Sequence, residues 1–324
     1  MKFLNDLRFQ KNLLLQNKSC LNKGTYILHN NLRTYLQLGH SASKWFPSAK
    51  ITLKNIVKIL IARIFYSIRI NKNGKQFSAQ AVYFSNELQT CNRDIKFFDY
   101  EKQIIKTICP NRSRYDSYMR NRSYFGDYFP LVDLLATDEE ELAFVEKMIT
   151  KSSISDEEWE SVFQKLFSIY SAYYNKKEID AKHNVTYLCT NFSRGKIEKN
   201  YFVTSFYRQH GDLSSDNFIY DTNGNVYIID YEHADYYPYF YDLFFLMVNL
   251  YVWKDNHIGI NLMVKGSFDN YFKNTADDST TSIYDAFLLF ADYFLSVYSK
   301  KGLPYEWCVK YDEFFGHVLD MLKR

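Results

Sequence analysis

Glycine and proline are scarce in this chain, whose 324 residues include 11 glycines and 5 prolines. The two commonest phosphate-binding loops need glycine, because a Cβ atom would keep the backbone away from the ligand. Neither G-x-G-x-x-G nor G-x-x-x-x-G-K-S/T occurs in the sequence. The sequence therefore disfavours a Walker-type nucleotide hydrolase and a standard dinucleotide-binding fold.

Paired cysteines, an export signal and a long apolar run are also missing. The five cysteines are odd in number and form no C-x-x-C pair, which suits buried thiols in a reducing cytoplasm better than disulfides or zinc. No apolar run with a small-residue cleavage site opens the chain, so we expect no signal peptide. The most apolar stretch, 51–70, contains four Lys or Arg residues, so we expect no membrane span and a cytoplasmic protein.

Aromatic residues are abundant instead, with 29 Tyr, 27 Phe and 4 Trp. Apolar residues make up 47% of the chain and charged residues 24%, which allows a sizeable core and excludes a disordered or fibrous protein. The length fits one large domain or two.

Charge is distributed unevenly along the chain. Residues 1–75 carry 14 Lys or Arg and the single acid Asp6, whereas the remainder carries 26 basic and 36 acidic residues. We interpret 1–75 as a basic extension that contacts an anionic surface, either a membrane leaflet or a polyanionic substrate; a solvated or internally neutralised face is the alternative. No nucleic-acid-binding module accompanies the charge. Deleting residues 1–60 is expected to leave the rest folded and to weaken binding to anionic vesicles.

Residues 76–150 are predicted to form a small sheet with one helix inserted before its last strands. Asn71 to Lys75 resembles a turn between two strands, and Pro130 is expected to end the helix. The expected strands are 63–70, 76–84, 94–100, 103–109 and 142–149, and the expected helix is 111–129.

Residues 151–324 are predicted to be mostly helical. Ser155 and Glu158 form a capping box ahead of an apolar stripe at helical spacing. Two further helices are expected at 284–299 and 305–322. The only strands predicted in this half form one hairpin, and the fold class is therefore α+β.

That hairpin contains the strongest functional signal. The chain reads His210-Gly211-Asp212-Leu213-Ser214-Ser215-Asp216-Asn217 and continues through a turn at Asn223-Gly224 to Asp230. If Asn223-Gly224 is a two-residue loop, Asn217 lies opposite Asp230 on the same face. An amide oxygen and a carboxylate placed together suit Mg²⁺, which prefers one or two carboxylates plus nucleotide phosphates.

Asp212 precedes Asn217 by five residues and is expected in the loop beside the metal position. A carboxylate there can accept the proton of an attacking hydroxyl, which is the base role in phosphoryl transfer.

These motifs resemble a known family. His-Gly-Asp-Leu, the Ile-Asp-Tyr-Glu-His-Ala run that contains Asp230, and the Pro-Tyr-Phe-Tyr-Asp-Leu run that contains Asp242 resemble the aminoglycoside phosphotransferase and choline kinase branch of the protein-kinase-like superfamily. The resemblance covers about residues 205–245 and implies a two-lobed fold, with a small antiparallel-sheet N-lobe at 76–150 and a mostly helical C-lobe at 151–324. It also implies ATP and Mg²⁺ as cofactors.

By position, the resemblance implies roles for five residues. Asp212 would be the catalytic base, Asn217 and Asp230 the Mg²⁺ ligands, His210 a brace for the metal-binding segment, and Asp242 a support behind them. Ser214-Ser215 replaces the His-Pro of the family pattern.

The resemblance also implies a lysine that holds the nucleotide phosphates. Lys106 is the first candidate and Lys96 the second. The helix glutamate that should pair with this lysine is absent from 111–129, and Asp116 is the nearest substitute.

The expected acceptor is a hydroxyl of a choline-type, aminoglycoside-type or sugar-type molecule, or of a cell-surface glycan precursor. Glu232 and Asp235 are candidates for holding an ammonium group of such a substrate, together with the aromatic run around Tyr236, although core packing is the simpler interpretation of those rings. The alternative function is a pseudokinase scaffold at the membrane surface.

Overall fold

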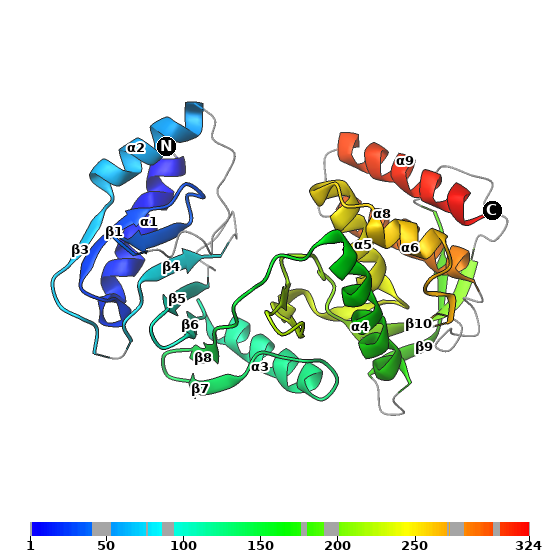
Figure 1. Ribbon diagram of the computed structural model, residues 1–324, viewed down its shortest axis with the longest axis horizontal. Helices are drawn as coiled ribbons and strands as arrows, with labels where there is room; N and C mark the ends of the chain where they lie inside the picture. The colour runs from blue at the N-terminus through cyan, green and yellow to red at the C-terminus, as the bar shows by residue number, and fades with distance from the viewer. Residues whose placement is uncertain are drawn as a thin grey trace. The chain divides into compact units, whose positions relative to one another are not determined.

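The computed structural model describes most of the chain, which divides into two compact units. One unit comprises Met1–Met119 and Val132–Ile149, and the other comprises Arg120–Leu131 and Thr150–Arg324 (Figure 1). The described residues are 2–40, 53–75, 77–85, 94–175, 180–190, 201–270, 272, 282–300 and 305–323.

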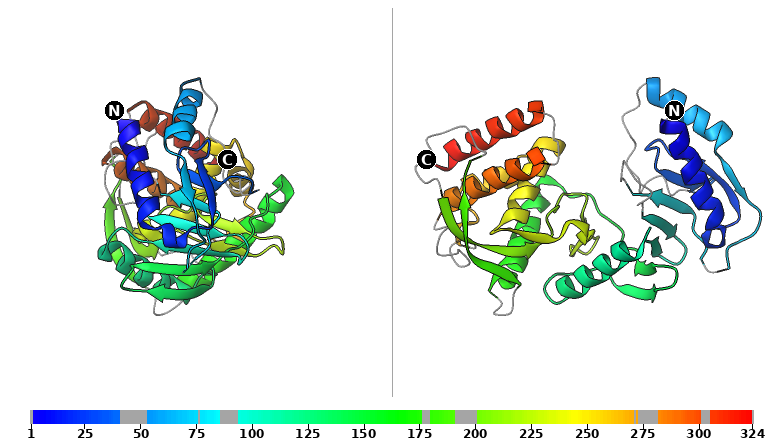
Figure 2. Two further views of the ribbon diagram at one scale, coloured as in Figure 1. Left: turned by 90° about the vertical axis from the view of Figure 1, so that its left-hand side faces the viewer. Right: turned by 180° about the vertical axis from the view of Figure 1, so that it is seen from behind.

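The first unit is built on an eight-stranded antiparallel sheet in the order β3-β1-β2-β4-β5-β6-β8-β7. Helices α1 and α2 lie at the β1 and β3 end of this sheet (Figures 1 and 2). The strands are β1 Gly24–Leu28, β2 Thr34–Gln37, β3 Ile68–Ile70, β4 Ala81–Phe84, β5 Ile95–Asp99, β6 Ile104–Ile108, β7 Leu134–Asp138 and β8 Ala143–Lys147, and the helices are α1 Lys2–Gln16, α2 Leu53–Phe65 and α3 Arg112–Gly126.

Residues 1–75, which we expected to form an extension, are instead part of this unit. They supply three of the eight strands, and Leu7, Leu14, Tyr26 and Tyr35 are fully buried in its core. Removing residues 1–60 would strip that core, so we no longer expect the remainder to fold without them. The excess of Lys and Arg masked the apolar pattern, because those long side chains occupy outward positions while the apolar positions face the sheet.

The hairpin expected between 63–70 and 76–84 is also wrong. Residues up to Phe65 continue α2, β3 pairs with β1, and β4 pairs with β2 and β5. The intervening turn binds another part of the chain: the Gly74 N–H donates to the Leu21 carbonyl at 2.7 Å, and Asn73 Oδ1 accepts from the Lys23 N–H at 2.8 Å. Turn-forming residues predicted the bend correctly but not which strands it joins.

Several local predictions are confirmed. Strands β5 and β6 pair around Glu101-Lys102, α3 ends before Pro130, and β8 lies within 142–149.

Three of the four cysteines in the described part of the chain are buried, and all four are free thiols; Cys91 lies outside the described residues. None of the described helices combines the length and hydropathy needed to cross a membrane.

The second unit is mostly helical, as predicted, and helices α8 and α9 run side by side (Figures 1 and 2). It also contains a three-stranded sheet, β13-β10-β9, that the sequence patterns did not predict. Its elements are α4 Asp156–Tyr174, β9 Ala181–Leu188, β10 Tyr201–Gln209, β11 Phe218–Tyr220, β12 Val226–Ile228, β13 Asp235–Pro238, α5 Tyr241–Lys254, α6 Ile258–Val264, α8 Ile283–Lys300 and α9 Tyr305–Leu322.

The capping box predicted at the start of α4 is confirmed, because both of its hydrogen bonds are present. Ser155 Oγ accepts from the Glu158 N–H at 3.3 Å, and Glu158 Oε2 accepts from the Ser155 N–H at 2.8 Å. The following apolar stripe, including Val162, Leu166 and Tyr170, is fully buried in an aromatic-rich core. An antiparallel-sheet unit and a mostly helical unit together confirm the α+β class.

Candidate active site

The hairpin β11–β12 presents the predicted metal-binding residues at its open end. Its turn is a three-residue loop rather than the two-residue loop that we expected. The Asp221 carboxylate accepts hydrogen bonds from the N–H groups of Asn223 and Asn225 at 2.9 and 2.8 Å, and the Gly224 N–H donates to the Asp221 carbonyl. Gly224 has φ +78°. A type I turn followed by a left-handed residue is the usual three-residue hairpin loop.

The longer loop shifts the register by one residue. Phe218 pairs with Ile228, and the Ile229 N–H donates to the Asn217 carbonyl at 3.0 Å. Asn217 therefore lies opposite Ile229, and the expected pairing of Asn217 with Asp230 is wrong. Asp230 adopts a left-handed conformation, φ 67° and ψ 58°, that ends the strand and starts the 3₁₀ turn Tyr231–His233.

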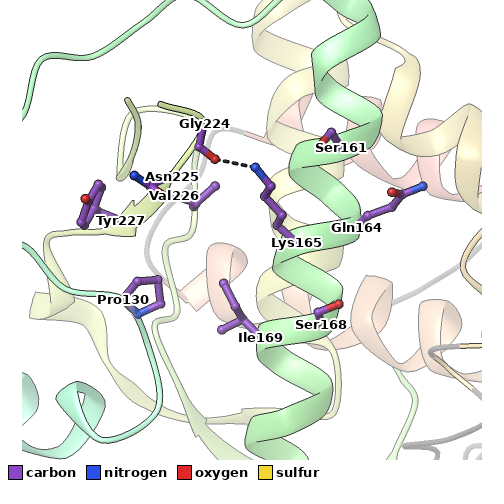
Figure 3. A pocket seen from close by; sticks show the side chains of 10 residues that line it. All are labelled: Pro130, Ser161, Gln164, Lys165, Ser168, Ile169, Gly224, Asn225, Val226 and Tyr227. Atoms are coloured by element: carbon purple, nitrogen blue, oxygen red, sulfur yellow. Dashed lines mark hydrogen bonds between the residues drawn. The ribbon is translucent and has the colours of Figure 1, made fainter. Parts of the chain in front are cut away.

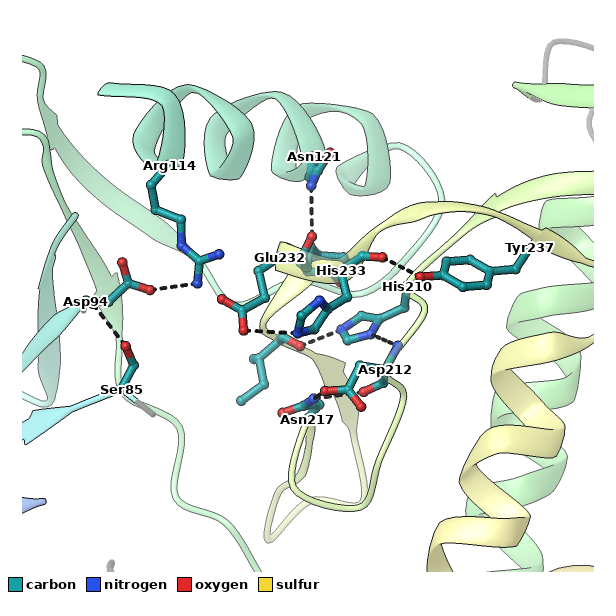
Figure 4. Close-up of polar contacts among 12 residues, drawn as sticks. Ser85, Asp94, Arg114, Asn121, His210, Asp212, Asn217, Glu232, His233 and Tyr237 are labelled. Carbon is teal, nitrogen blue, oxygen red and sulfur yellow. Dashed lines mark hydrogen bonds and ion pairs between the residues drawn. The ribbon is translucent and has the colours of Figure 1, made fainter. Parts of the chain in front are cut away.

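Asp212 and Asn217 are held together directly (Figure 4). The Asn217 Nδ2 group donates to the Asp212 carbonyl at 2.8 Å and to Asp212 Oδ2 at 3.0 Å. Because the side-chain nitrogen Nδ2 faces Asp212, the side-chain oxygen Oδ1 of Asn217 lies on the other side of the amide group. The five-residue spacing thus fixes the carboxylate and presents a hard oxygen beside it.

Asp230 lies close enough to Asp212 to act on it electrostatically. Burial raises the pKa of Asp212, and the negative charge of Asp230 raises it further. A positive charge on His233, or on His210 when that ring is protonated, and the hydrogen bond from Asn217 oppose this rise in the pKa. The structure therefore brings Asp212, Asn217 and Asp230 together, although by a route other than strand pairing.

His210 connects the loop to the segment that carries Asp230 (Figure 4). Its Nε2 lies 2.8 Å from the Ile229 carbonyl, and its Nδ1 accepts from the Asp212 N–H at 3.2 Å. An accepting Nδ1 requires the tautomer protonated at Nε2, which donates to the carbonyl. The ring is 1% exposed, so both contacts are protected from water.

Asp242, in the first turn of α5, anchors the same loop from behind. Its carboxylate accepts from the N–H groups of His210 and Gly211, each at 2.8 Å, and from the Tyr170 hydroxyl at 2.7 Å. The side chain is fully buried, which raises its pKa, while His210 and these hydrogen bonds favour the ionised form. Gly211 has φ +79° and lies against the Tyr237 ring, a position that leaves no room for a Cβ atom.

Sequence reasoning missed several residues that support the loop. Ser215, which replaces the proline of the family pattern, is held by the Asn249 amide oxygen at 3.3 Å and by Lys151 Nζ, which donates to its carbonyl at 2.9 Å. Gln209 is fully buried and donates to the Tyr237 and Pro238 carbonyls at 3.1 and 2.7 Å. Ser215 and Gln209 could have been found only from their proximity to the motif. Lys151 and Asn249 are distant from the motif in sequence and carry no such signal.

The donor set fits a divalent cation such as Mg²⁺. Two carboxylates, Asp212 and Asp230, repel each other beside the Asn217 amide oxygen, and a cation would relieve that repulsion. No group of three or more His, Cys, Asp or Glu side chains suited to a metal occurs within the described ranges. The site therefore offers a partial shell of hard oxygens, not the closed shell of a structural metal site.

In the first unit, Lys106 lies on β6 and has an acidic partner. Its Nζ is 2.5 Å from Glu141 Oε2, and its side chain is 10% exposed. Asp116, the partner expected from the sequence, is half exposed and faces Arg112 on the same helix at 3.9 Å, so that expectation is wrong. Glu141 follows β7 in a turn, 35 residues from Lys106, where no local pattern could identify it.

Lys96, the second candidate, lies on β5 and points to the opposite face. Lys96 pairs with Thr107, whereas Lys106 pairs with Phe97, which is buried in the core shared with α1. Directly opposed residues share a face of the sheet. The two lysines therefore cannot serve the same phosphate from this sheet.

Glu232 and Asp235 follow Asp230 closely. Glu232 Oε1 lies 3.3 Å from His233 Nε2, and Asp235 is an exposed residue of β13. The neighbouring rings of Tyr237, Tyr239, Phe240 and Tyr241 are buried, so this aromatic run is mainly core, the simpler of the two interpretations.

A cavity of about 670 Å³ opens between α4 and the turn of the hairpin (Figure 3). It is lined in part by Lys165, Tyr227 and Gly224, and Lys165 Nζ donates to the Gly224 carbonyl. Asp212, Asn217 and Asp230 lie at the open end of the hairpin and do not line this cavity.

Comparison with known proteins adds a family signature. Among solved structures, the chain is similar to choline kinase LicA from Streptococcus pneumoniae, with 14% identity, 74% of this chain and 93% of that chain covered, and a TM-score of 0.41. A putative aminoglycoside phosphotransferase from Ralstonia eutropha has 10% identity, coverage of 76% and 92%, and a TM-score of 0.44. A mutant of aminoglycoside phosphotransferase APH(4)-Ia in complex with ADP and hygromycin B has 9% identity, coverage of 75% and 95%, and a TM-score of 0.44.

A search of curated proteins finds no match. The sequence model of the phosphotransferase enzyme family, APH, matches residues 205–271, a range that contains Asp212, Asn217, Asp230 and Asp242. This match confirms the resemblance to phosphotransferase enzymes that the motifs of the catalytic loop predicted.

Proposed function

We propose that the protein is a phosphotransferase that uses ATP and Mg²⁺ to phosphorylate a hydroxyl group on a small molecule or a cell-surface glycan precursor. The observation that carries the proposal is the grouping of Asp212, Asn217 and Asp230 on a loop anchored by buried His210 and Asp242. The family match over the same residues supports it.

Asp212 is the residue that would take the proton of the acceptor hydroxyl. Asn217 holds Oδ2, which leaves Oδ1 to face the acceptor. The raised pKa makes the ionised carboxylate a better base than an ordinary aspartate, while a positive charge on His233 opposes this rise in the pKa. A base fixed in one rotamer also orients the hydroxyl for attack.

Asp230 and the Asn217 amide oxygen would hold Mg²⁺, which when bound screens the charge of the nucleotide phosphates. The left-handed backbone at Asp230 and the contact from His210 to Ile229 fix the direction of the Asp230 side chain. Asp242 holds the Gly211 and His210 N–H groups and so sets the distance between the two sides of the site.

For the nucleotide phosphates we propose Lys106, because Glu141 fixes its ammonium group. Lys96 is the alternative. Since the two side chains lie on opposite faces, the variants Lys106→Met and Lys96→Met distinguish them. Lys106→Met should abolish the thermal shift caused by ATP and Lys96→Met should retain it, and the reverse result would favour Lys96. Equal shifts in both variants would reject a lysine contact from this sheet.

The acceptor class is proposed from the site chemistry. A carboxylate base beside a cation site transfers phosphate to a hydroxyl, and Glu232 and Asp235 would favour an acceptor that carries an ammonium group. Measuring ADP release with a panel of choline, aminoglycosides and neutral sugars as acceptors tests this. A preference for neutral sugars would contradict a role for Glu232 and Asp235 in binding the acceptor.

The decisive variant is Asp212→Asn, which keeps the size of the side chain and removes the base. We expect turnover to fall by about 10²- to 10⁴-fold, with the ATP-induced thermal shift retained. Asp216→Asn is the matched control, because Asp216 is an acid of the same loop that is 74% exposed and pairs with Lys254 at the surface. Turnover that survives in Asp212→Asn would reject the assignment.

The scaffold alternative rested on the missing helix glutamate and on the strongly basic residues 1–75. Lys106 has an acidic partner in Glu141, which removes the first motivation. Absence of any thermal shift with ATP and Mg²⁺ in the unmodified protein would restore it.

A further inference from the structure

Helix α2 is apolar on two sides. Ala62 is buried in the core of the first unit, and Ile59 is also buried. On the other side the helix exposes a second set of aliphatic side chains, with exposed fractions of 38, 51, 53 and 68%. This set, which we call the α2 stripe, consists of Ile56, Val57, Leu60 and Ile64.

The α2 stripe is continuous along the helix. At 3.6 residues per turn, its four members fall within an arc of about 100°, and Ile59 and Ala62 lie on the opposite side. A surface helix normally places charged or polar residues in that arc. An apolar stripe of this kind marks a surface that contacts another apolar phase.

Arg63 borders the α2 stripe, and α2 contains no acid. Arg63 is tied to the rest of the unit through the Leu28 carbonyl at 3.3 Å and Asn30 Oδ1 at 3.2 Å. Lys58 lies on the side of the helix away from the α2 stripe, with its Nζ 5.2 Å from the centroid of the Phe3 ring. The combination of an apolar stripe with basic residues and no acid on the same helix is typical of helices that lie in the interface of an anionic bilayer.

The sheet order keeps this positive charge apart from the largest group of acids in the same unit; Asp6 on α1 is the exception at the basic end. The group on and around β7 and β8, at the end of the sheet opposite to β3, β1 and β2, consists of Asp133, Asp138, Glu139, Glu140, Glu141 and Glu146. Five strand spacings separate β1 from β8, on the order of 24 Å at about 4.8 Å per strand. That distance exceeds the Debye length of about 8 Å at physiological salt, so these acids do not neutralise the basic end.

We propose that the α2 stripe docks on an anionic lipid bilayer, with its aliphatic side chains at the boundary between headgroups and acyl chains. Binding of a second copy fits less well. A symmetric dimer would place the same surface of both copies together and so bring Arg63 of both copies into one interface. Anionic headgroups complement these charges, and each Lys or Arg near such a surface strengthens binding about fivefold.

The test uses the full-length protein and sedimentation with two kinds of vesicle, phosphatidylcholine alone and phosphatidylcholine mixed with phosphatidylglycerol. We expect binding to the mixed vesicles that weakens as salt is added. The double variant Leu60→Glu/Ile64→Glu should bind them at least about tenfold more weakly, because two aliphatic side chains no longer leave water. Both positions are exposed, so the far-ultraviolet circular dichroism should not change.

Leu135→Glu is the matched control, since Leu135 is 54% exposed on β7 at the other end of the sheet. Its vesicle binding should equal that of the unmodified protein. No binding to either vesicle, equal binding to both, or unchanged binding by the double variant would overturn the proposal. A dimer that light scattering detects and that the double variant dissociates would also overturn it, in favour of self-association.

Discussion

The contact of Gly211 with Tyr237 makes the anchoring of the catalytic loop testable. Gly211 has φ +79°, and a Cβ atom there would lie about 2.5 Å from ring carbons of Tyr237. Tyr237 is buried, its hydroxyl donates to the His233 carbonyl at 2.9 Å, and its ring stacks on Tyr241, so it has little room to move. Gly211→Ala should therefore destabilise the second unit through both backbone and packing.

Gly224→Ala isolates the backbone contribution. Gly224 has φ +78°, almost the same as Gly211, but its added Cβ would meet only ordinary contacts, the nearest at 3.4 Å. A left-handed alanine costs about 1–2 kcal/mol, partly offset by a less flexible unfolded chain. We expect a loss of about 1 kcal/mol for Gly224→Ala and, with about 1–3 kcal/mol more for overpacking, about 2–4 kcal/mol for Gly211→Ala.

Urea unfolding monitored by tryptophan fluorescence measures the difference, because three of the four tryptophans, Trp159, Trp253 and Trp307, belong to the second unit. Turnover provides a second comparison: Gly211→Ala should lower it strongly by moving the loop away from Asp242, whereas Gly224→Ala, at the far end of the hairpin, should not. Equal stability losses in the two variants would refute the argument from the Tyr237 contact.

Three further predictions follow from the same loop and from the start of α4. Catalysis needs ionised Asp212, whose pKa is raised, so kcat/KM should fall with decreasing pH through a pKa above the ordinary aspartate range. His233→Gln removes a positive charge and should move this pKa upward. An unchanged or lowered pKa in the variant would contradict the interaction between His233 and Asp212. Asp242→Asn leaves one oxygen for two backbone donors, so we expect a loss of about 2 kcal/mol, reduced by relief of a buried charge, and a larger loss of turnover than of folded protein; full turnover would exclude an anchoring role. Ser155→Ala should lower the free energy of unfolding by about 1 kcal/mol, seen as a lower urea midpoint, without changing kcat; an unchanged midpoint would show that the capping box is not stabilising.

Features encoded by neighbouring residues were predictable. The capping box at Ser155, the β5–β6 pair around Glu101-Lys102 and the end of α3 before Pro130 each depend on residues within a few positions. The functional motif belongs to the same group, because Asp212 and Asn217 are five residues apart and contact each other directly.

Features that depend on distant residues were not predictable. The pairing of β3 with β1 joins residues more than 40 positions apart. Lys106 forms its ion pair with Glu141 rather than with Asp116, which is nearer in sequence. Local patterns indicate that a segment is a strand, but the partner is selected by burial of the whole sheet. The strong charge of residues 1–75 made this misassignment easier, since charge describes the surface of a unit and not its core.

The hairpin shows how a correct motif can accompany a wrong geometry. A single additional loop residue, stabilised by the Asp221 carboxylate, shifts every cross-strand pair by one. Strand pairing therefore does not bring Asp230 to Asp212. Asp230 instead follows the strand in a left-handed conformation, and φ above zero at an aspartate has only a weak sequence signal.

The same contacts explain why a loop can hold a precise arrangement here. Asp242 belongs to the first turn of α5, and its other partner, Tyr170, belongs to α4, so the loop's two backbone N–H groups are fixed to both helices at a fully buried point. Any movement of the loop would leave a buried carboxylate without donors, which is costly. The aromatic core around Tyr170 thus acts on the site through Asp242, and substitutions in that core should change turnover before they unfold the protein.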